Sequence, residues 1–265
     1  MKIQKVLITG GSRGMGLSLV KLFEKQVSEV HTVSRTVQLQ QLDPNVFHHQ
    51  CDLSSLSASE KFINYFIDEH GIPDLLINNA GSGVFFDWAN FPIEEINKQI
   101  NLLFTIPVML CRKVAPLMAD KRSGVILNLT SLATLYPLPF MPLYNAGKSA
   151  LSAFTQSMLL EFDEYPKFID FRMGDVNTDF NNVSVKPIQD KWSDPMKRAW
   201  QQIEKQLHHS PTPEVAANQI LNVISKSNSG IYYGGGILQS KIAPFLPRFL
   251  SSKFLNKILR SRYNQ

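Results

Sequence analysis

Near its start the chain reads Val6-Leu7-Ile8-Thr9-Gly10-Gly11-Ser12-Arg13-Gly14-Met15-Gly16-Leu17, and this stretch decides the fold. An apolar run, a glycine-rich turn and an amphipathic pattern follow one another, which predicts a buried strand that turns into a helix. Gly10 permits the tight turn, Gly14 lets the backbone approach a pyrophosphate, and Gly16 allows the helix to pack closely on the strand. Because a helix amino terminus attracts anions, the stretch predicts a dinucleotide-binding unit.

The rest of the chain repeats the alternation of strand and helix. Further strand-like runs open at Val30, Phe47, Leu75, Val125, Ile169 and Ile231, and helical patterns fill most of the intervals. This alternation predicts an α/β fold with a doubly wound parallel sheet and helices on both faces. With 265 residues, 44% of them hydrophobic, we expect one domain over residues 1–236 and a tail over residues 237–265.

Two arginines indicate which dinucleotide binds. The second strand ends in Ser34-Arg35, where an NAD enzyme usually carries an acidic residue for the ribose hydroxyls. Arg35 and Arg13 instead offer charge-assisted hydrogen bonds to a 2′-phosphate, so we expect NADP(H) rather than NAD(H). The alternative is that both arginines are solvated surface residues.

Two further turns are candidates for the adenosine half of the cofactor. In Cys51-Asp52-Leu53 a carboxylate follows the third strand and is able to accept from the adenine amino group, or else to cap the helix that begins near Ser57. In Asn78-Asn79-Ala80-Gly81 small residues let the backbone lie against a ribose, although the composition is also that of an ordinary turn.

The candidate reaction centre follows the fifth strand. Ser131 comes directly after the apolar run 125–130, at the strand edge where open α/β sheets bind ligands. Tyr144 and Lys148 lie four residues apart in a helical pattern and so share one face. An ammonium beside a phenol lowers the pKa of the phenol, which suits Tyr144 to acid/base work with Ser131 binding a substrate oxygen. The alternative is a surface pair with a capping serine.

Taken together, these motifs resemble the short-chain dehydrogenase/reductase superfamily over residues 3 to about 236. The motifs are Thr9-Gly10-x3-Gly14-x-Gly16, Asn78-Asn79-Ala80-Gly81, Asn101, Ser131 and Tyr144-x3-Lys148. The resemblance implies a seven-stranded Rossmann-type sheet, a nicotinamide dinucleotide, and a homodimer or homotetramer assembled through the helices near residues 93–119 and 144–163. It departs from the family at Met173, where Pro is usual, and this loosens the turn beside the nicotinamide.

The resemblance also implies the site residues. Tyr144 would be the general acid/base, Lys148 would lower its pKa and bind the nicotinamide ribose, and Ser131 would orient the carbonyl. Asn101 would hold a water for proton relay, unless it only faces solvent or kinks its helix. The residues expected to contact the cofactor are Thr9, Gly10, Ser12, Arg13, Gly14, Met15, Gly16, Ser34, Arg35, Asp52, Leu53, Asn79, Ala80, Gly81, Tyr144, Lys148, Gly174, Val176 and Thr178.

Aromatic residues indicate the substrate. The resemblance implies a lid over residues 179–210, which carries Phe180, Trp192, Met196 and Trp200; the facing wall would hold Phe85, Phe86, Leu132, Leu135, Tyr136, Phe140 and Met141. These residues line an apolar substrate site or belong to the core. We therefore expect an NADP(H)-dependent oxidoreductase acting on CH–OH groups, a reductase of a hydrophobic ketone or aldehyde. The alternative is a non-catalytic NADP-binding sensor or scaffold.

The positive charge lies in the tail. Residues 240–265 carry six basic and no acidic residues, so the net charge of +5 leaves the body without a basic excess, and we expect no nucleic-acid partner. Phe254, Leu255, Ile258 and Leu259 share one helical face. This face packs on the body or on a second subunit, or else it lies on an anionic membrane.

The cysteines and the apolar runs indicate where the protein is kept and whether it binds a metal. Neither Cys51 nor Cys111 has another potential metal ligand at a suitable spacing in the sequence, so we expect reduced thiols and no metal site. No signal-peptide pattern precedes the first strand, and no apolar run approaches the ~20 residues of a spanning helix. We expect a cytoplasmic protein, peripheral to a membrane if the tail binds one.

Overall fold

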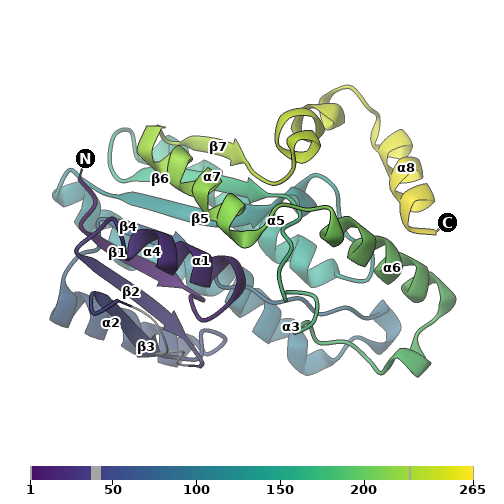
Figure 1. Cartoon of the computed structure of the whole chain (residues 1–265), viewed down its shortest axis with the longest axis horizontal. Coiled ribbons are helices and arrows are strands. Elements are labelled where there is room, and N and C mark those ends of the chain that lie inside the picture. The colour runs from purple at the N-terminus through teal and green to yellow at the C-terminus, as the bar shows by residue number, and fades with distance from the viewer. Residues whose placement is uncertain (1, 37–42, 227, 265) are drawn as a thin grey trace.

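The computed structural model describes residues 2–36, 43–226 and 228–264; Met1 and Gln265, the outer bounds of the expected domain and tail, lie outside these ranges. One seven-stranded sheet has the order β3-β2-β1-β4-β5-β6-β7, with every pair parallel (Figure 1). The strands are β1 (Lys5–Thr9), β2 (Glu29–Ser34), β3 (Val46–Gln50), β4 (Leu75–Asn78), β5 (Val125–Ser131), β6 (Lys167–Met173) and β7 (Gly230–Tyr233). The predicted doubly wound α/β fold is confirmed.

Helices cover both faces of the sheet. They are α1 (Gly14–Phe23), α2 (Leu56–His70), α3 (Ile93–Ile100), α4 (Ile106–Asp120), α5 (Pro142–Glu161), α6 (Asp194–His208), α7 (Pro213–Lys226) and α8 (Ser252–Asn264). Alternate β1 residues face opposite ways: Val6 and Ile8 pack with α1 and α7, whereas Leu7 packs with α2 and α4. The two faces therefore form two separate cores, each closed by its own helices.

One expectation about apolar runs is wrong. A π-helical turn at Asn101–Thr105 joins α3 to α4, so that Ile93–Asp120 forms one helical run of 28 residues. By length and composition this run is able to cross a membrane, and it is the only such run in the described chain. Leu110, Val114 and Met118 of the run are fully buried against the sheet, which is the packing of a core helix.

The expected lid supplies core residues rather than a free apolar wall. Trp192, Met196 and Trp200 are buried in a third cluster, together with Phe85 and Met141. The ring centroids of Phe85 and Trp200 lie 4.8 Å apart, and the rings meet edge to face. For these five residues the core interpretation holds, while Tyr136, Phe140 and Phe180 are only partly buried at the border of the cluster.

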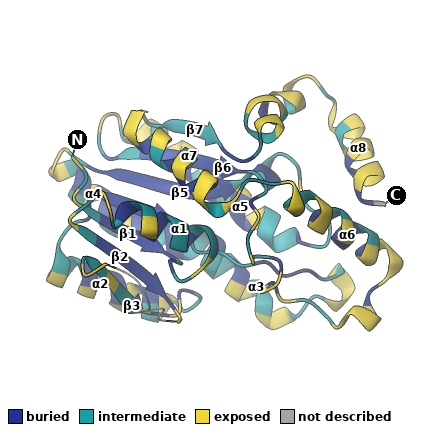
Figure 2. Cartoon of the chain, viewed as in Figure 1, coloured by how far each residue is buried: buried dark blue, intermediate teal, exposed yellow. Residues whose placement is uncertain are grey.

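The apolar face of the tail helix α8 is half buried against the body and half exposed. Leu259 is buried and Leu255 packs beside it on the α6 cluster, so α8 is docked on the body. Phe254 and Ile258, from the same predicted face, remain 51% and 42% exposed. Figure 2 shows exposed surface along α8 and the turns before it. The tail therefore packs with half of its stripe and presents the other half outward.

Candidate active site

Gly10 and Gly16 leave no room for a side chain in the glycine turn. Gly10 has φ +74°, and a Cβ on Gly16 would lie 2.1 Å from the Gly10 carbonyl oxygen, so α1 reaches the turn only because residue 16 is a glycine. Gly14 also has a positive φ, +53°. These are the backbone features expected of a turn that presents the amino terminus of a helix to an anion, and anion binding here stays a prediction.

The loop after β4 braces this turn. Asn79 donates through Nδ2 to the Thr9 carbonyl oxygen at 2.8 Å, and its backbone N–H donates to Thr9 Oγ1 at 2.9 Å. Ala80 donates to the same hydroxyl at 3.0 Å. In the protein alone, then, the side chains of Thr9 and Asn79 join β1 to β4.

The two arginines lie at the carboxyl edge of the sheet and are exposed. Arg13 precedes α1 as its N-cap residue without a capping side-chain bond, and Arg35 follows β2. Ser34, by contrast, is buried, and its hydroxyl donates to the Thr36 carbonyl oxygen at 2.8 Å. Both arginines are thus exposed, while the Ser34 hydroxyl is already engaged in a hydrogen bond.

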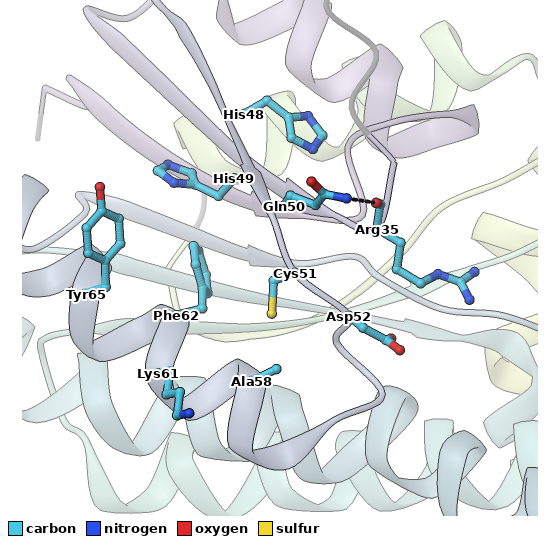
Figure 3. Close-up of a pocket in the computed structure, with 10 residues that line it drawn as sticks. All are labelled: Arg35, His48, His49, Gln50, Cys51, Asp52, Ala58, Lys61, Phe62 and Tyr65. Atoms are coloured by element: carbon cyan, nitrogen blue, oxygen red, sulfur yellow. Dashed lines mark hydrogen bonds between the residues drawn. The ribbon is translucent and has the colours of Figure 1, made fainter.

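A pocket of about 880 Å³ lies between the end of β3 and α2, and Arg35, Cys51 and Asp52 line it (Figure 3). Asp52 accepts from the Ser54 backbone N–H at 3.0 Å and from its hydroxyl at 2.8 Å, and these bonds lower the pKa of the carboxyl. The cap of α2 is Ser55, so capping by Asp52 is wrong. Leu53 is buried in the core.

Ser131, Tyr144 and Lys148 meet where β5 ends beside α5. The Ser131 hydroxyl accepts from the Ala133 N–H at 3.1 Å. Lys148 is only 5% exposed, and its ammonium donates to the Leu129 carbonyl oxygen at 2.5 Å. The Tyr144 ring lies edge-on to Phe180 with 5.7 Å between ring centroids. The structure therefore brings the three residues together at one strand end.

The pKa values of the pair depend mainly on burial. Burial raises the pKa of the Tyr144 phenol, a hydrogen bond with Ser131 lowers it in part, and the carboxylate of Asp175 raises it. Burial also lowers the pKa of Lys148 to about 8. The effect of Lys148 on the pKa of Tyr144 stays a prediction: in the protein alone the Lys148 ammonium donates to the Leu129 carbonyl oxygen, and burial is the largest influence on both pKa values.

Asn101 opens the π-helical turn and donates through Nδ2 to the Ser54 carbonyl oxygen at 3.1 Å. The side chain thus faces protein rather than solvent, and it interrupts the regular α-helix. The turn packs Leu103 against α5, where a Cβ on Gly147 would lie 2.7 Å from Leu103 Cβ. Close contact between these two helices holds Lys148 in the site.

The loop after β6 is held by a tail residue that sequence reasoning missed. Gln239 accepts from the Asp175 N–H at 3.1 Å and donates to the Asp175 carboxylate at 2.6 Å. A Cβ on Gly174 would lie 2.4 Å from Gln239 Oε1, so Gly174 makes room for this clamp. Val176 is buried, and Thr178 accepts from the Phe180 N–H at 3.3 Å. No local motif indicates this clamp, because Asp175 lies 64 residues from Gln239 in the sequence.

A buried ion pair beneath Lys148 was also missed. Asp170 is fully buried on β6 and accepts from Arg172 Nε at 3.0 Å and from Ser152 Oγ at 2.6 Å, and it also bonds to Thr130. Its charge raises the pKa of Lys148, against the larger effect of burial. The only sign of this ion pair in the sequence is that Asp170 and Arg172 alternate with apolar residues in β6.

Three features occur together in this fold: a doubly wound parallel sheet, the glycine turn, and a Ser-Tyr-Lys set at the carboxyl ends of the strands. Together they define a dinucleotide-binding oxidoreductase fold. The family model described as short chain dehydrogenase matches residues 4–188. The chain belongs to this family and is an oxidoreductase of the class that acts on CH–OH groups. Family membership goes against the alternative of a non-catalytic sensor or scaffold.

Curated relatives include enzymes named for lipid-like substrates. The chain is 28% identical over 233 residues to 3-ketodihydrosphingosine reductase of Bacteroides thetaiotaomicron, covering 86% of each chain. It is 30% identical over 171 residues to 3alpha-hydroxysteroid dehydrogenase of Mediterraneibacter gnavus, covering 61% of this chain and 68% of that one.

Solved structures share the fold. A short-chain dehydrogenase from Sphingobium yanoikuyae in complex with NADPH aligns with a TM-score of 0.75 and 19% identity, over 98% of this chain and 96% of that one. A 4-hydroxyisoleucine dehydrogenase complexed with NADH aligns with a TM-score of 0.74 and 22% identity, over 87% and 96%. At these identities the likeness concerns the fold.

Proposed function

We propose that the protein is an NADP(H)-dependent reductase of a hydrophobic ketone or aldehyde. The observation that carries the proposal is one sheet edge that holds the glycine turn, two exposed arginines and the Ser131-Tyr144-Lys148 set. Arg13 and Arg35 favour the 2′-phosphate of NADP(H), since no carboxylate follows β2 to bind a bare ribose. The relatives named for a keto-sphingoid base and a steroid support an apolar substrate.

NADPH, when bound, supplies the hydride for the carbonyl carbon. Tyr144 then donates its phenolic proton to the carbonyl oxygen, and the Ser131 hydroxyl donates a hydrogen bond to that oxygen as negative charge develops on it. Lys148 binds the nicotinamide ribose and stabilises the phenolate that remains. Burial raises the pKa of the Tyr144 phenol above its ordinary value, so at neutral pH the phenol holds the proton that this step gives to the carbonyl oxygen.

The remaining assigned residues would hold the cofactor. Residues 9–16 take the pyrophosphate, Asp52 with Leu53 and residues 79–81 take the adenosine half, and Gly174, Val176 and Thr178 lie against the nicotinamide. Asn101 keeps its expected relay role as part of this proposal. The catalytic domain would span residues 1–236 with a lid over 179–210.

Titration with NADPH and NADH tests the cofactor, with wild type compared with Arg35→Ala and with Lys226→Ala as an exposed control outside the site. We expect NADPH to bind more tightly and the preference to fall by at least tenfold only in Arg35→Ala. Equal affinities in wild type would refute the NADP assignment.

Turnover of a substrate panel tests the reaction. With NADPH we expect 3-ketodihydrosphingosine or a steroid ketone to exceed short polar ketones in kcat/KM. Tyr144→Phe should abolish turnover and retain NADPH binding, because the ring still fills its place beside Phe180. Full activity of this variant would contradict the role of Tyr144.

Exposed apolar residues support a homodimer or homotetramer. Leu160 on α5 is 91% exposed and Ile93 on α3 is 79% exposed, on the two helical regions expected to form subunit contacts. Light scattering after chromatography should give a multiple of the 30.0 kDa chain mass, and Leu160→Glu should lower it. A monomeric wild type would refute the assembly.

The outward half of the tail supports a peripheral membrane contact of a cytoplasmic protein. Phe249, Phe254 and Ile258 are exposed beside basic residues, a combination that suits anionic lipid. Sedimentation with phosphatidylserine vesicles should carry wild type down, and Phe254→Ser with Ile258→Ser should stay in solution. Equal recovery on phosphatidylcholine vesicles would refute an anionic surface as the target.

A further inference from the structure

Three histidines that are distant in sequence gather near one edge of the sheet. His31 lies on β2, His49 lies on β3, and His70 is the last residue of α2. One ring nitrogen from each lies within 4.8 Å of the other two. His31 Nδ1 and His49 Nε2 are 3.0 Å apart, and the His31 and His70 ring centroids are 4.6 Å apart.

The fold itself creates this grouping. Val33 pairs with His49, and His31 lies two residues before Val33, so the two imidazoles project from the same face of neighbouring strands. Gly71 ends α2 with φ +74°, and its N–H donates to the Ile67 carbonyl oxygen, which leaves His70 in the last turn above them. Lys5 bonds to the His70 carbonyl oxygen and fixes the helix end to the sheet.

A carboxylate orients the most buried ring. His31 is 1% exposed, and its Nε2 lies 3.3 Å from the Glu29 carboxylate, which Lys5 holds at 3.2 Å. If Nε2–H donates to Glu29, the Nδ1 lone pair points to His49. Metal-binding histidines are oriented in this way, with the second ring nitrogen donating to a carboxylate.

The protein itself uses few of the ring nitrogens in this cluster. Among the described residues, His70 has no hydrogen-bond partner at either ring nitrogen, and the His49 ring meets His31 at 3.0 Å. The three imidazoles therefore converge with ring nitrogens that other described groups leave unused.

We propose that His31, His49 and His70 bind one divalent transition-metal ion of the kind that prefers imidazole, with Zn²⁺ as the representative ion. Imidazole nitrogens suit zinc, copper and nickel, and three protein ligands leave a coordination position for water. His49 also lines the pocket of Figure 3, through which an ion is able to arrive.

This site is separate from the proposed reduction. The ion would join β2, β3 and the end of α2, the elements around the pocket beside Arg35. The site departs from the expectation of no metal, because spacings of 18 and 21 residues form no local motif. The competing interpretation is a packed ring cluster, since His31 also stacks on Phe47 at 4.9 Å.

The test measures metal binding on the full chain after chelation and dialysis. Calorimetry with Zn²⁺ should show one equivalent bound, and Co²⁺ should give the visible absorption of a nitrogen-ligated ion. Glu29→Gln should weaken Zn²⁺ binding by about 10- to 100-fold through the lost orientation of His31. Removing a ligand in His49→Asn or His70→Asn should weaken it further.

His48→Asn is the matched control, because His48 is adjacent on β3 and bonds to Ser34 on the other face. Far-ultraviolet circular dichroism and urea unfolding confirm that each variant is folded, and two independent ligand variants guard against the failure of one. The proposal is overturned if wild type binds no Zn²⁺, or if His49→Asn and His70→Asn bind it as tightly as His48→Asn.

Discussion

Replacing Lys148 by Met should change how stability depends on pH. The pKa of this buried lysine is about 8 in the folded protein, against its ordinary value of 10.5, because desolvation opposes the charged form. Between these two values the unfolded chain binds more protons than the folded one, so the free energy of unfolding rises with pH. The penalty is present in full below the folded pKa and is relieved as pH approaches the unfolded value.

The two pKa values set the size of the effect. Each unit of difference corresponds to about 1.4 kcal/mol, so the penalty at pH 7 is about 3 kcal/mol and falls to about 1 kcal/mol at pH 9.5. Wild type without cofactor should therefore gain about 2 kcal/mol between these pH values relative to Lys148→Met. The comparison removes the contributions of other titrating groups that the two proteins share.

Urea unfolding at pH 7 and pH 9.5 measures this difference, with Lys191→Met as a control at an exposed position. Lys191→Met should follow wild type, and Lys148→Met should lack the gain and have no turnover. Parallel stability changes in wild type and Lys148→Met, within about 0.5 kcal/mol, would show that burial does not depress the pKa of Lys148.

Three other variants test the packing around the site. Asp170→Asn leaves Arg172 as an uncompensated buried charge and should lower the unfolding free energy by about 3–5 kcal/mol in urea, whereas a loss below about 1 kcal/mol would contradict a buried ion pair. Gly16→Ala places a methyl group 2.1 Å from the Gly10 carbonyl oxygen, so dinucleotide binding should be lost in a titration, and unchanged affinity would refute the tight turn. Leu259→Ala should cost about 2–4 kcal/mol and speed proteolysis of α8, and equal cleavage rates would show that the tail is not docked.

Sequence patterns were sufficient for the architecture. Strands were predicted to open at Val30 and Ile169 and do so at Glu29 and Lys167, one and two residues earlier. Gly10 and Gly16 indicated the tight turn and the close packing that the structure shows. Such features are readable because hydrophobic period and the conformational freedom of glycine act over a few neighbouring residues.

The sequence predicted which residues form the candidate site, but it could not predict their contacts or their pKa values. The spacing of Tyr144 and Lys148 placed both on one helix face, yet it could not show that Lys148 bonds to the Leu129 carbonyl oxygen. A pKa depends on the depth of burial and on groups such as Asp170, which arrive from other strands.

The sequence by itself determined the order of elements, the glycine turn and the strand end that carries the candidate active site. Only the tertiary structure decided that Trp192 and Trp200 belong to the core, that Gln239 clamps the loop at Asp175, and that α8 buries Leu259. The physical reason is range. Local patterns fix which face of an element is apolar, whereas the partner of each side chain depends on how distant elements pack together.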